Sequence, residues 1–256
     1  MAKIISITNQ KGGVGKTTTA INLSAALAEA NQKILLVDFD PQINATTGLG
    51  VELDDEDKTV MDAIHNHSII NDAIIKDVKD NLDVLPGSIE LSSLETELLN
   101  KNDREAELKN VLEQVREEYD YILIDCPPAV GILTVNALVA SDACIIPVQC
   151  EYFSLEGLKQ VLSAVELIRS GMNPALKIEG LLFTMYDART RLAQDVVNMI
   201  KSNIDDVKIF ETMIPRNIRL AEAPSNGLSI LEYAGDSIGA DRYRKLAGEI
   251  LRNSEG

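Results

Sequence analysis

The sequence has no tryptophan and few aromatic residues of any kind, so large rings cannot supply most of its core. Aromatic residues make up 4% of the 256 residues, whereas 45% are hydrophobic. We therefore expect isoleucine, leucine, valine and alanine to form the core. A chain of this length and composition can bury a large one.

Long hydrophobic runs are also absent. No run approaches the roughly 20 residues that a membrane-spanning helix needs. A secretory leader is not expected either, because Asn9, Gln10 and Lys11 interrupt the first apolar run. We expect a cytoplasmic protein with no stable membrane association.

Basic residues and cysteines are scarce. The chain has 24 Lys and Arg against 40 Asp and Glu, a formal net charge of −16. Such a surface disfavours indiscriminate contact with nucleic acid, so DNA binding would need a local basic patch. The three cysteines, Cys126, Cys144 and Cys150, form no CxxC pair, and we expect buried, reduced thiols.

Apolar strands alternate with helical patterns along the chain. Strands are expected at 3–8, 33–38, 82–86, 121–125, 143–148, 178–184 and 207–210. Helices are expected at 17–30, at 92–118 with a break considered near Asn102, at 131–140, 154–170 and 189–203, and near 61–64 and 237–251. This alternation predicts a single domain, 1–256, with a doubly wound, mostly parallel α/β sheet and helices on both faces. The polar stretch 52–80 is interpreted as a surface excursion.

A glycine-rich segment lies between the first expected strand and the first long helix. It reads Lys11, Gly12, Gly13, Val14, Gly15, Lys16, Thr17, Thr18. Glycines let backbone N–H groups turn toward phosphate oxygens, and the helix offers its positive end to the same anion. We expect Lys16 to contact the β- and γ-phosphates, Thr17 to bind Mg²⁺ and Thr18 to add a phosphate contact. The segment predicts a P-loop for ATP and Mg²⁺.

This loop departs from the standard pattern GxxxxGK followed by Ser or Thr. Gln10 stands where the first glycine belongs, and Lys11 is an additional lysine. The loop resembles the deviant Walker A motif, in whose carriers the early lysine reaches the nucleotide of the other subunit across a dimer interface. A second lysine is costly there unless phosphate neutralises it. The alternative is that Lys11 is an exposed surface lysine.

Carboxylates follow two of the apolar strands. Asp125 ends the strand 121–125 and is expected to hold the Mg²⁺ shell as a Walker B residue that acts through water. Asp40 follows the strand 33–38 and is placed to orient or deprotonate the attacking water. Asp38 is a weaker candidate for the metal shell. For each, a helix cap or turn carboxylate is the alternative.

The whole chain resembles the ParA/Soj family of chromosome- and plasmid-partitioning ATPases, within the wider group that includes MinD. The resemblance rests on the motifs 8–19, 38–42, 125–128, 147–151 and 215–217. It implies an ATP-dependent homodimer that binds double-stranded DNA non-specifically on the nucleoid. It also implies that a ParB-type partner stimulates hydrolysis and releases the DNA. One departure is Ile43, where the family usually has glycine; a β-branched residue resists positive φ.

The resemblance also assigns roles to individual residues. Asp40 corresponds to the hydrolysis residue, and Lys11 and Lys16 act with it on the phosphates. The adenine base is expected to lie against Met185, Pro215 and Asn217. Arg189 and Arg219 are the expected DNA contacts, and the alternative is that they are scattered surface arginines.

Three other functions remain open at this level. A MinD-like membrane-surface positioning ATPase would need an amphipathic C-terminal helix, but Gly248 interrupts the apolar stretch there. A metabolic or redox ATPase, such as an amidoligase or an iron–sulfur carrier, would need a substrate motif or exposed cysteines. A P-loop protein that binds nucleotide without turnover is disfavoured by the presence of both Asp40 and Asp125.

Overall fold

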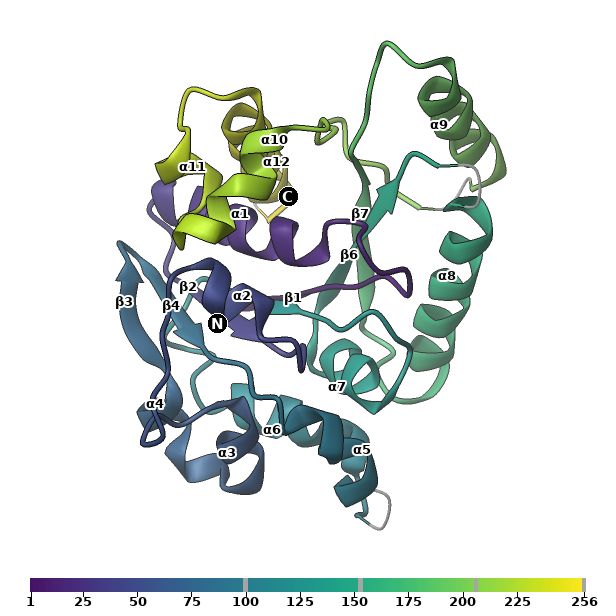
Figure 1. Cartoon of the computed structure of the whole chain (residues 1–256). Helices are drawn as coiled ribbons and strands as arrows, with labels where there is room; N and C mark the ends of the chain where they lie inside the picture. The colour runs from purple at the N-terminus through teal and green to yellow at the C-terminus, as the bar shows by residue number, and fades with distance from the viewer. Residues whose placement is uncertain (99–100, 152–153, 205–206, 255–256) are drawn as a thin grey trace.

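A seven-stranded sheet lies at the centre of the protein and carries helices on both faces (Figure 1). The computed structural model describes residues 1–98, 101–151, 154–204 and 207–254. The strands are β1 (Lys3–Ile7), β2 (Ile34–Asp38), β3 (Ile75–Lys79), β4 (Leu82–Leu85), β5 (Tyr121–Asp125), β6 (Ala143–Gln149) and β7 (Lys177–Thr184). Their order is β3-β4-β2-β5-β1-β6-β7, and only the β3–β4 pair is antiparallel. The predicted fold class is confirmed.

The helices divide between the faces because successive strand residues point to opposite sides. They are α1 (Lys16–Glu29), α2 (Asn44–Gly48), α3 (Val60–His65), α4 (Ile70–Ala73), α5 (Leu91–Leu98), α6 (Glu107–Leu112), α7 (Ile132–Ala140), α8 (Ser154–Gly171), α9 (Arg191–Asn203), α10 (Ile218–Glu222), α11 (Ile230–Tyr233) and α12 (Ile238–Ser254). Ile4 packs with residues of α3, α5, α6 and α7, while its neighbour Ile5 packs with α1 and α12. Residues of α8 and α9 share a third cluster with β6 and β7.

The parallel register brings the carboxyl ends of the central strands together. Asp125 of β5 lies opposite Ile7 of β1 on one side and Asp38 of β2 on the other. The chain leaves β1 at this edge and turns back into α1 (Figure 1). In open α/β sheets this edge is where ligands bind.

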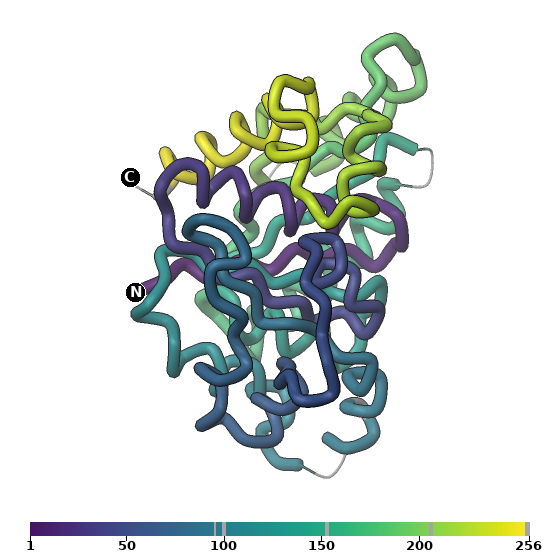
Figure 2. Tube along the Cα trace, turned by 60° about the vertical axis from the view of Figure 1, so that its left-hand side comes forward, coloured from purple at the N-terminus to yellow at the C-terminus, as the bar shows by residue number. Residues whose placement is uncertain are grey.

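Helix α12 is packed along α1, as Figures 1 and 2 show from two directions. Its residues Tyr243, Leu246 and Ile250 are at most 1% exposed and belong to the core that α1 shares. This apolar face is therefore occupied by protein. None of the helices in the described part of the chain combines the length and apolarity that crossing a lipid bilayer demands.

One expected element differs in the structure. The segment 207–210 forms no strand, because Ile209 makes only an isolated bridge to Leu181. The chain then turns away, and the buried Glu249 carboxylate accepts hydrogen bonds from the backbone N–H groups of Glu211 and Thr212 at 3.0 and 2.8 Å. In the expected helix 92–118, the break considered near Asn102 is present, because α5 and α6 are separate and Asp103 between them has a φ of 57°.

The polar stretch 52–80 holds more regular structure than its sequence indicated. It contains α3, which matches the helix expected near 61–64, and also α4 and β3, which were not expected. Strand β3 pairs antiparallel with β4 through a tight connection at Asn81, whose φ is 61°. Strand β3 was missed because its residues 75–79 are half-buried or exposed and alternate little in polarity. As an edge strand, it needs no continuous apolar run.

Gly180 offers a test of how closely β7 packs. A Cβ at this position would lie 2.7 Å from Cε2 of Phe210, whose ring is 1% exposed. We expect Gly180→Ala to lower the free energy of unfolding by about 1–3 kcal/mol, because a fully buried ring has little room to move. Urea denaturation would measure the change.

Gly157 in α8 is the matched control, because a Cβ there meets nothing within 4 Å. Gly157→Ala is expected to raise the free energy of unfolding by about 0.5–1 kcal/mol through helix propensity. Equal effects of the two substitutions would contradict the packing argument.

Candidate nucleotide-binding site

The loop between β1 and α1 has the backbone shape that an anion cradle requires. Gly13 and Gly15 have φ values of 73° and 88°, a region that glycine enters without steric cost. Gly15 directly precedes α1, so the free N–H groups of the first helical turn face the loop. The predicted P-loop geometry is present.

Side chains from distant strands hold this loop in place. Asn9 donates from Nδ2 to the carbonyl oxygen of Pro147 at 2.6 Å and accepts from the backbone N–H of Lys11 at 3.0 Å. The Thr184 hydroxyl at the end of β7 donates to the carbonyl oxygen of Val14 at 2.8 Å. The loop is thereby fastened to the carboxyl ends of β6 and β7, which gives it a fixed position over the sheet.

Lys16 is buried beneath the loop, with 6% of its surface exposed. Its Nζ donates to the carbonyl oxygen of Lys11 at 3.3 Å. Burial lowers the pKa of Lys16, while the charges of Asp125 and Asp40 act in the opposite direction. Lys16 therefore lies within electrostatic reach of both carboxylates, at the place where the phosphates of a bound nucleotide would add further negative charge.

Asp125 is fully buried, and no described residue donates a hydrogen bond to either of its carboxylate oxygens. Burial raises the pKa of Asp125 well above its usual range, and the neighbouring Asp38 adds to the rise. The nearby Thr17 hydroxyl and the Lys16 charge act in the opposite direction, although Thr17 does not reach either oxygen with hydrogen-bond geometry. A buried, unpartnered carboxylate of this kind is costly, and a cation would relieve the cost.

Magnesium fits this donor set. Mg²⁺ is usually held by one or two carboxylates together with water and substrate phosphates, and not by a cage of protein ligands. Thr17 and Asp125 supply one hydroxyl and one carboxylate beside the loop. Among the described residues, no group of three or more His, Cys, Asp or Glu could hold a metal unaided.

Asp38 accepts hydrogen bonds from helix α2. Its Oδ2 accepts hydrogen bonds from the Thr46 backbone N–H at 2.8 Å and from the Thr46 hydroxyl at 2.7 Å. Burial raises the pKa of Asp38 to about 6, against the effect of these hydrogen bonds. Asp38 therefore positions the start of α2, which leaves it less available as a metal ligand than Asp125.

The turn after Asp40 contains a strained residue. Asp40 is 5% exposed, and its Oδ1 accepts from the Gln42 backbone N–H at 3.0 Å. Ile43 has a φ of 50° despite its branched Cβ, and its N–H donates to the Asp40 carbonyl oxygen at 2.9 Å. Left-handed backbone costs a non-glycine residue about 1–2 kcal/mol. The turn thus keeps the conformation that glycine would favour.

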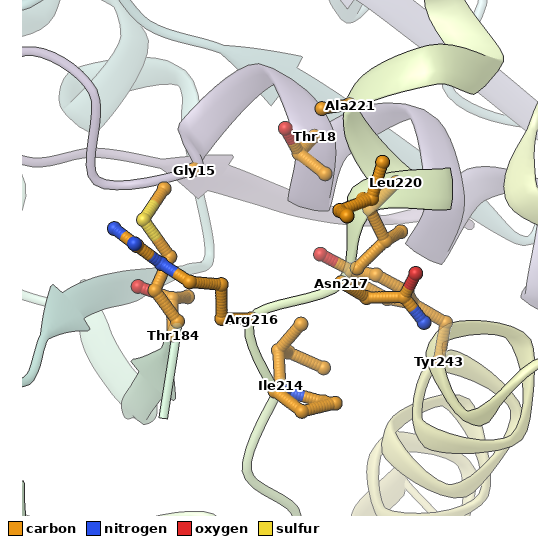
Figure 3. Close-up of a pocket in the computed structure, with 12 residues that line it drawn as sticks. Gly15, Thr18, Thr184, Ile214, Arg216, Asn217, Leu220, Ala221 and Tyr243 are labelled. Carbon is orange, nitrogen blue, oxygen red and sulfur yellow. The ribbon is translucent and has the colours of Figure 1, made fainter. Parts of the chain in front are cut away.

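A cavity of about 310 Å³ opens beside the loop (Figure 3). Met185, Pro215 and Asn217 line it, as the adenine assignment requires, together with Gly15 and Thr18 of the loop and its helix. Its walls are mostly apolar. The cavity has the size and character of a pocket for a flat aromatic base.

Several lining residues were not identified from the sequence. Tyr243 of α12 is 1% exposed, and its hydroxyl lies 3.3 Å from the Thr19 hydroxyl. Thr184 and Arg216 also line the cavity. Only the position of Arg216 between Pro215 and Asn217 offered a local signal. Tyr243 is distant in sequence from every motif, so the packing of α12 on α1 alone brings it here.

The remaining predicted residues lie apart from this cavity. Lys11 is exposed, and its Nζ lies 2.5 Å from Oε2 of Glu151. Arg189, whose side chain is 89% exposed, precedes α9 and pairs with Asp187 at 2.8 Å. Arg219 lies exposed on α10 and is not brought together with Arg189 in one groove.

The parallel sheet, the glycine loop before α1, the buried lysine and the strand-end carboxylates define a P-loop nucleoside triphosphatase. Comparison with known proteins narrows this class. A family model described as an AAA domain matches residues 2–178. The sporulation initiation inhibitor protein Soj of Bacillus subtilis is 51% identical over 253 residues, covering 99% of this chain and all of that protein.

A second relative is the chromosome-partitioning ATPase Soj of Treponema pallidum, which is 51% identical and covers 98% of each chain. A solved structure of cobyrinic acid a,c-diamide synthase from Mycobacterium smegmatis, with bound ADP and magnesium, is 33% identical. It has a TM-score of 0.87 and covers 100% of this chain and 96% of that one. The chain belongs to the Soj/ParA family of chromosome-partitioning ATPases.

The buried carboxylates predict how stability depends on pH. Because burial raises the pKa of Asp125 and of Asp38, the folded protein binds protons more tightly than the unfolded chain. Without metal and nucleotide, the contribution of these two groups to the free energy of unfolding should fall as pH rises from about 4, the carboxyl pKa of an unfolded chain, toward neutrality. Asp125→Asn should flatten this fall and raise the value at pH 7 by about 1 kcal/mol.

Denaturation across a pH series would measure both effects. Asp195→Asn, on the exposed side of α9, is the control and should behave as wild type. A variant at Asp125 whose pH profile matches wild type would contradict the assigned burial cost.

Proposed function

We propose that this protein is a DNA-partitioning ATPase, folded as a single P-loop domain over 1–256, that pairs into a homodimer when it binds ATP and Mg²⁺. The dimer binds double-stranded DNA on the nucleoid without sequence preference. ATP hydrolysis, stimulated by a ParB-type partner, releases the dimer from the DNA. The observation that carries the proposal is a P-loop with one lysine buried at the carboxylates, Lys16, and a second exposed at its rim, Lys11.

The nucleotide is proposed to extend from the loop into the apolar cavity. Lys16 and the N–H groups at the start of α1 bind the phosphates, and Thr18 lies where the loop meets the cavity. Met185, Pro215 and Asn217 hold the base. Thr17 and Asp125 would hold Mg²⁺, which when bound neutralises phosphate charge. The solved diamide synthase with ADP and magnesium, which shares this fold, supports the choice of ligands.

Asp40 is proposed to orient the attacking water. The carboxylate lies in a turn stiffened by Pro41 and is close enough to Lys16 for the two charges to interact. Its Oδ1 accepts a hydrogen bond from the Gln42 N–H, whereas its Oδ2 accepts none from any described residue. That oxygen is thus available to a water molecule.

Lys11 is proposed to act across the dimer. Its ion pair with Glu151 joins two side chains that are 42% and 49% exposed. Exposed pairs of this kind contribute about 0–1 kcal/mol, so a triphosphate on a facing subunit can replace Glu151. The lysine lies at the rim of the loop, where a second subunit can approach it.

Several observations favour this function over the alternatives. The apolar face of α12 is packed on α1, so this helix is not free to bind a membrane as in the MinD-like alternative. All three cysteines are buried, which does not suit an iron–sulfur cluster shared between subunits. The diamide synthase shares the fold at 33% identity, but two Soj proteins share 51%.

Asp40→Ala tests the catalytic assignment. We expect ATP hydrolysis to fall by about 100-fold or more, because the water loses its orienting carboxylate, while ATP binding and dimerisation persist. Phosphate release and size-exclusion chromatography with ATP would measure the two properties. Lys16→Ala, as a control, should lose nucleotide binding itself. Unchanged turnover in the Asp40 variant would remove this residue from the mechanism.

The proposed DNA binding is tested by measuring affinity for DNA with ATP, with ADP and without nucleotide, each across a salt series. Binding should require ATP and weaken steeply with salt. Arg189→Glu should retain ATP-dependent dimerisation but bind DNA at least about tenfold more weakly, since a repulsive charge replaces a phosphate contact.

Arg169→Glu, on α8 and 45% exposed, is the control for a charge reversal elsewhere and should bind as wild type. ATP-dependent flotation with anionic liposomes in the absence of DNA binding would instead favour the membrane-surface alternative.

A further inference from the structure

A groove of about 520 Å³ lies next to the base cavity and is lined by arginines from three separate segments. Arg189 precedes α9, Arg216 precedes α10, and Arg242 belongs to α12. Three arginines from distant parts of the chain thus converge on one concave surface. In a chain of net charge −16, this concentration of guanidinium groups is unusual.

Two of these arginines are without a salt bridge in the part of the chain that the structure describes. Arg216 and Arg242 make no salt bridge with any residue in the described ranges, although Arg242 is half-buried. Arg104, Arg116, Arg169 and Arg244 are paired. Outside the groove, Arg191, Arg219 and Arg252 also make no salt bridge with a described residue, so it is the convergence of arginines on one concave surface that distinguishes the groove. An unpaired guanidinium presents several hydrogen-bond donors in a geometry that suits phosphate.

The carboxylates of the groove do not cancel this charge. Asp187 and Glu211 line it beside the three arginines, so the side chains sum to 3 − 2 = +1. Asp187 is already engaged, because its two oxygens accept from Nε and Nη2 of Arg189 at 2.9 and 2.8 Å. These hydrogen bonds hold the pKa of Asp187 at about 2, so it stays ionised and keeps Arg189 in place. Glu211 remains exposed at the wall.

Arg216 and Pro215 belong to both the groove and the base cavity. Figure 3 shows the Arg216 side chain on the same side of the cavity as Gly15 and Thr184. Backbone hydrogen bonds also join the two sites: the Tyr186 N–H donates to Ile214 O at 3.0 Å, and the Arg216 N–H donates to Tyr186 O at 3.3 Å. The segment after β7 that carries Arg189 is therefore hydrogen-bonded to the segment 214–216, which lines the cavity proposed for the base.

We propose that this groove receives a phosphate of the DNA backbone, with Arg242 and Arg216 as contacts in addition to Arg189. Arg216 serves both ligands, because it lines the nucleotide cavity and the groove. The inference rests on the proposed DNA binding and adds to it the residues and the link to the nucleotide. A nucleotide base that holds Arg216 in place would thereby prepare the groove for a phosphate of the DNA backbone.

The test compares Arg242→Ala, Arg216→Ala and the control Arg169→Ala in the full chain. Fluorescence anisotropy of a short labelled duplex, with a non-hydrolysable ATP analogue and a salt series, measures DNA binding. Titration of the analogue without DNA measures nucleotide binding. Thermal unfolding checks that each variant is folded.

Both groove variants should bind DNA about three- to tenfold more weakly. The negative slope of log K against log salt should become shallower by about 0.9 for each phosphate that the protein no longer neutralises. Arg216→Ala should also weaken binding of the analogue without DNA, whereas Arg242→Ala should leave it unchanged. The control should match wild type in both assays.

The outcomes separate the two proposals. Wild-type protein that binds no DNA with the analogue would overturn the proposed function and the groove with it. Wild-type binding that Arg242→Ala leaves unaltered in affinity and salt slope would overturn the groove alone. An Arg216→Ala variant that changes only one of the two affinities would refute its shared role.

Discussion

A pair of buried carboxyl groups at the carboxyl edge of the central strands is the constraint on which the site depends. Register places Asp38 and Asp125 side by side on β2 and β5, and both are fully buried. Burial raises the pKa of both carboxyls, the Asp38 charge adds to the rise at Asp125, and the Asp40 charge adds to the rise at Asp38. Thr46 compensates Asp38, but Asp125 keeps its oxygens unpartnered among the described residues. The uncompensated oxygens make this edge favourable for a divalent cation, and Lys16 and the loop make it favourable for the phosphates that accompany one.

The rest of the site is organised around that edge by contacts between strand ends. The loop is fastened to β6 through Asn9 and to β7 through Thr184, so that it lies over Asp125. On the opposite side, the Thr46 hydroxyl donates to Asp38 and accepts from the Gly87 N–H at 3.0 Å. The turn carrying Asp40 is thereby joined to the chain that follows β4.

Much of the fold and site could be predicted because the signals are local. The strand, glycine turn and helix are contiguous in sequence, and strand-end positions identified Asp125 and Asp40 as neighbours of the loop. One element was predicted wrongly and one was missed. The apolar stretch 207–210 makes a single bridge to Leu181, since Glu249 from a distant helix draws the following backbone away. Strand β3 escaped detection because an edge strand with half-exposed residues lacks a strong periodic pattern.

The sequence by itself determined the P-loop, its additional lysine, the parallel α/β sheet and the strand-end carboxylates, because each follows from residue type and spacing over short distances. Only the tertiary structure decided that Tyr243 lines the cavity beside the loop, that Glu151 pairs with Lys11 and that Arg216 and Arg242 share a groove with Arg189. These contacts join segments far apart in the chain. Their formation depends on how helices pack across the sheet, a long-range outcome of burying apolar surface that no local pattern records.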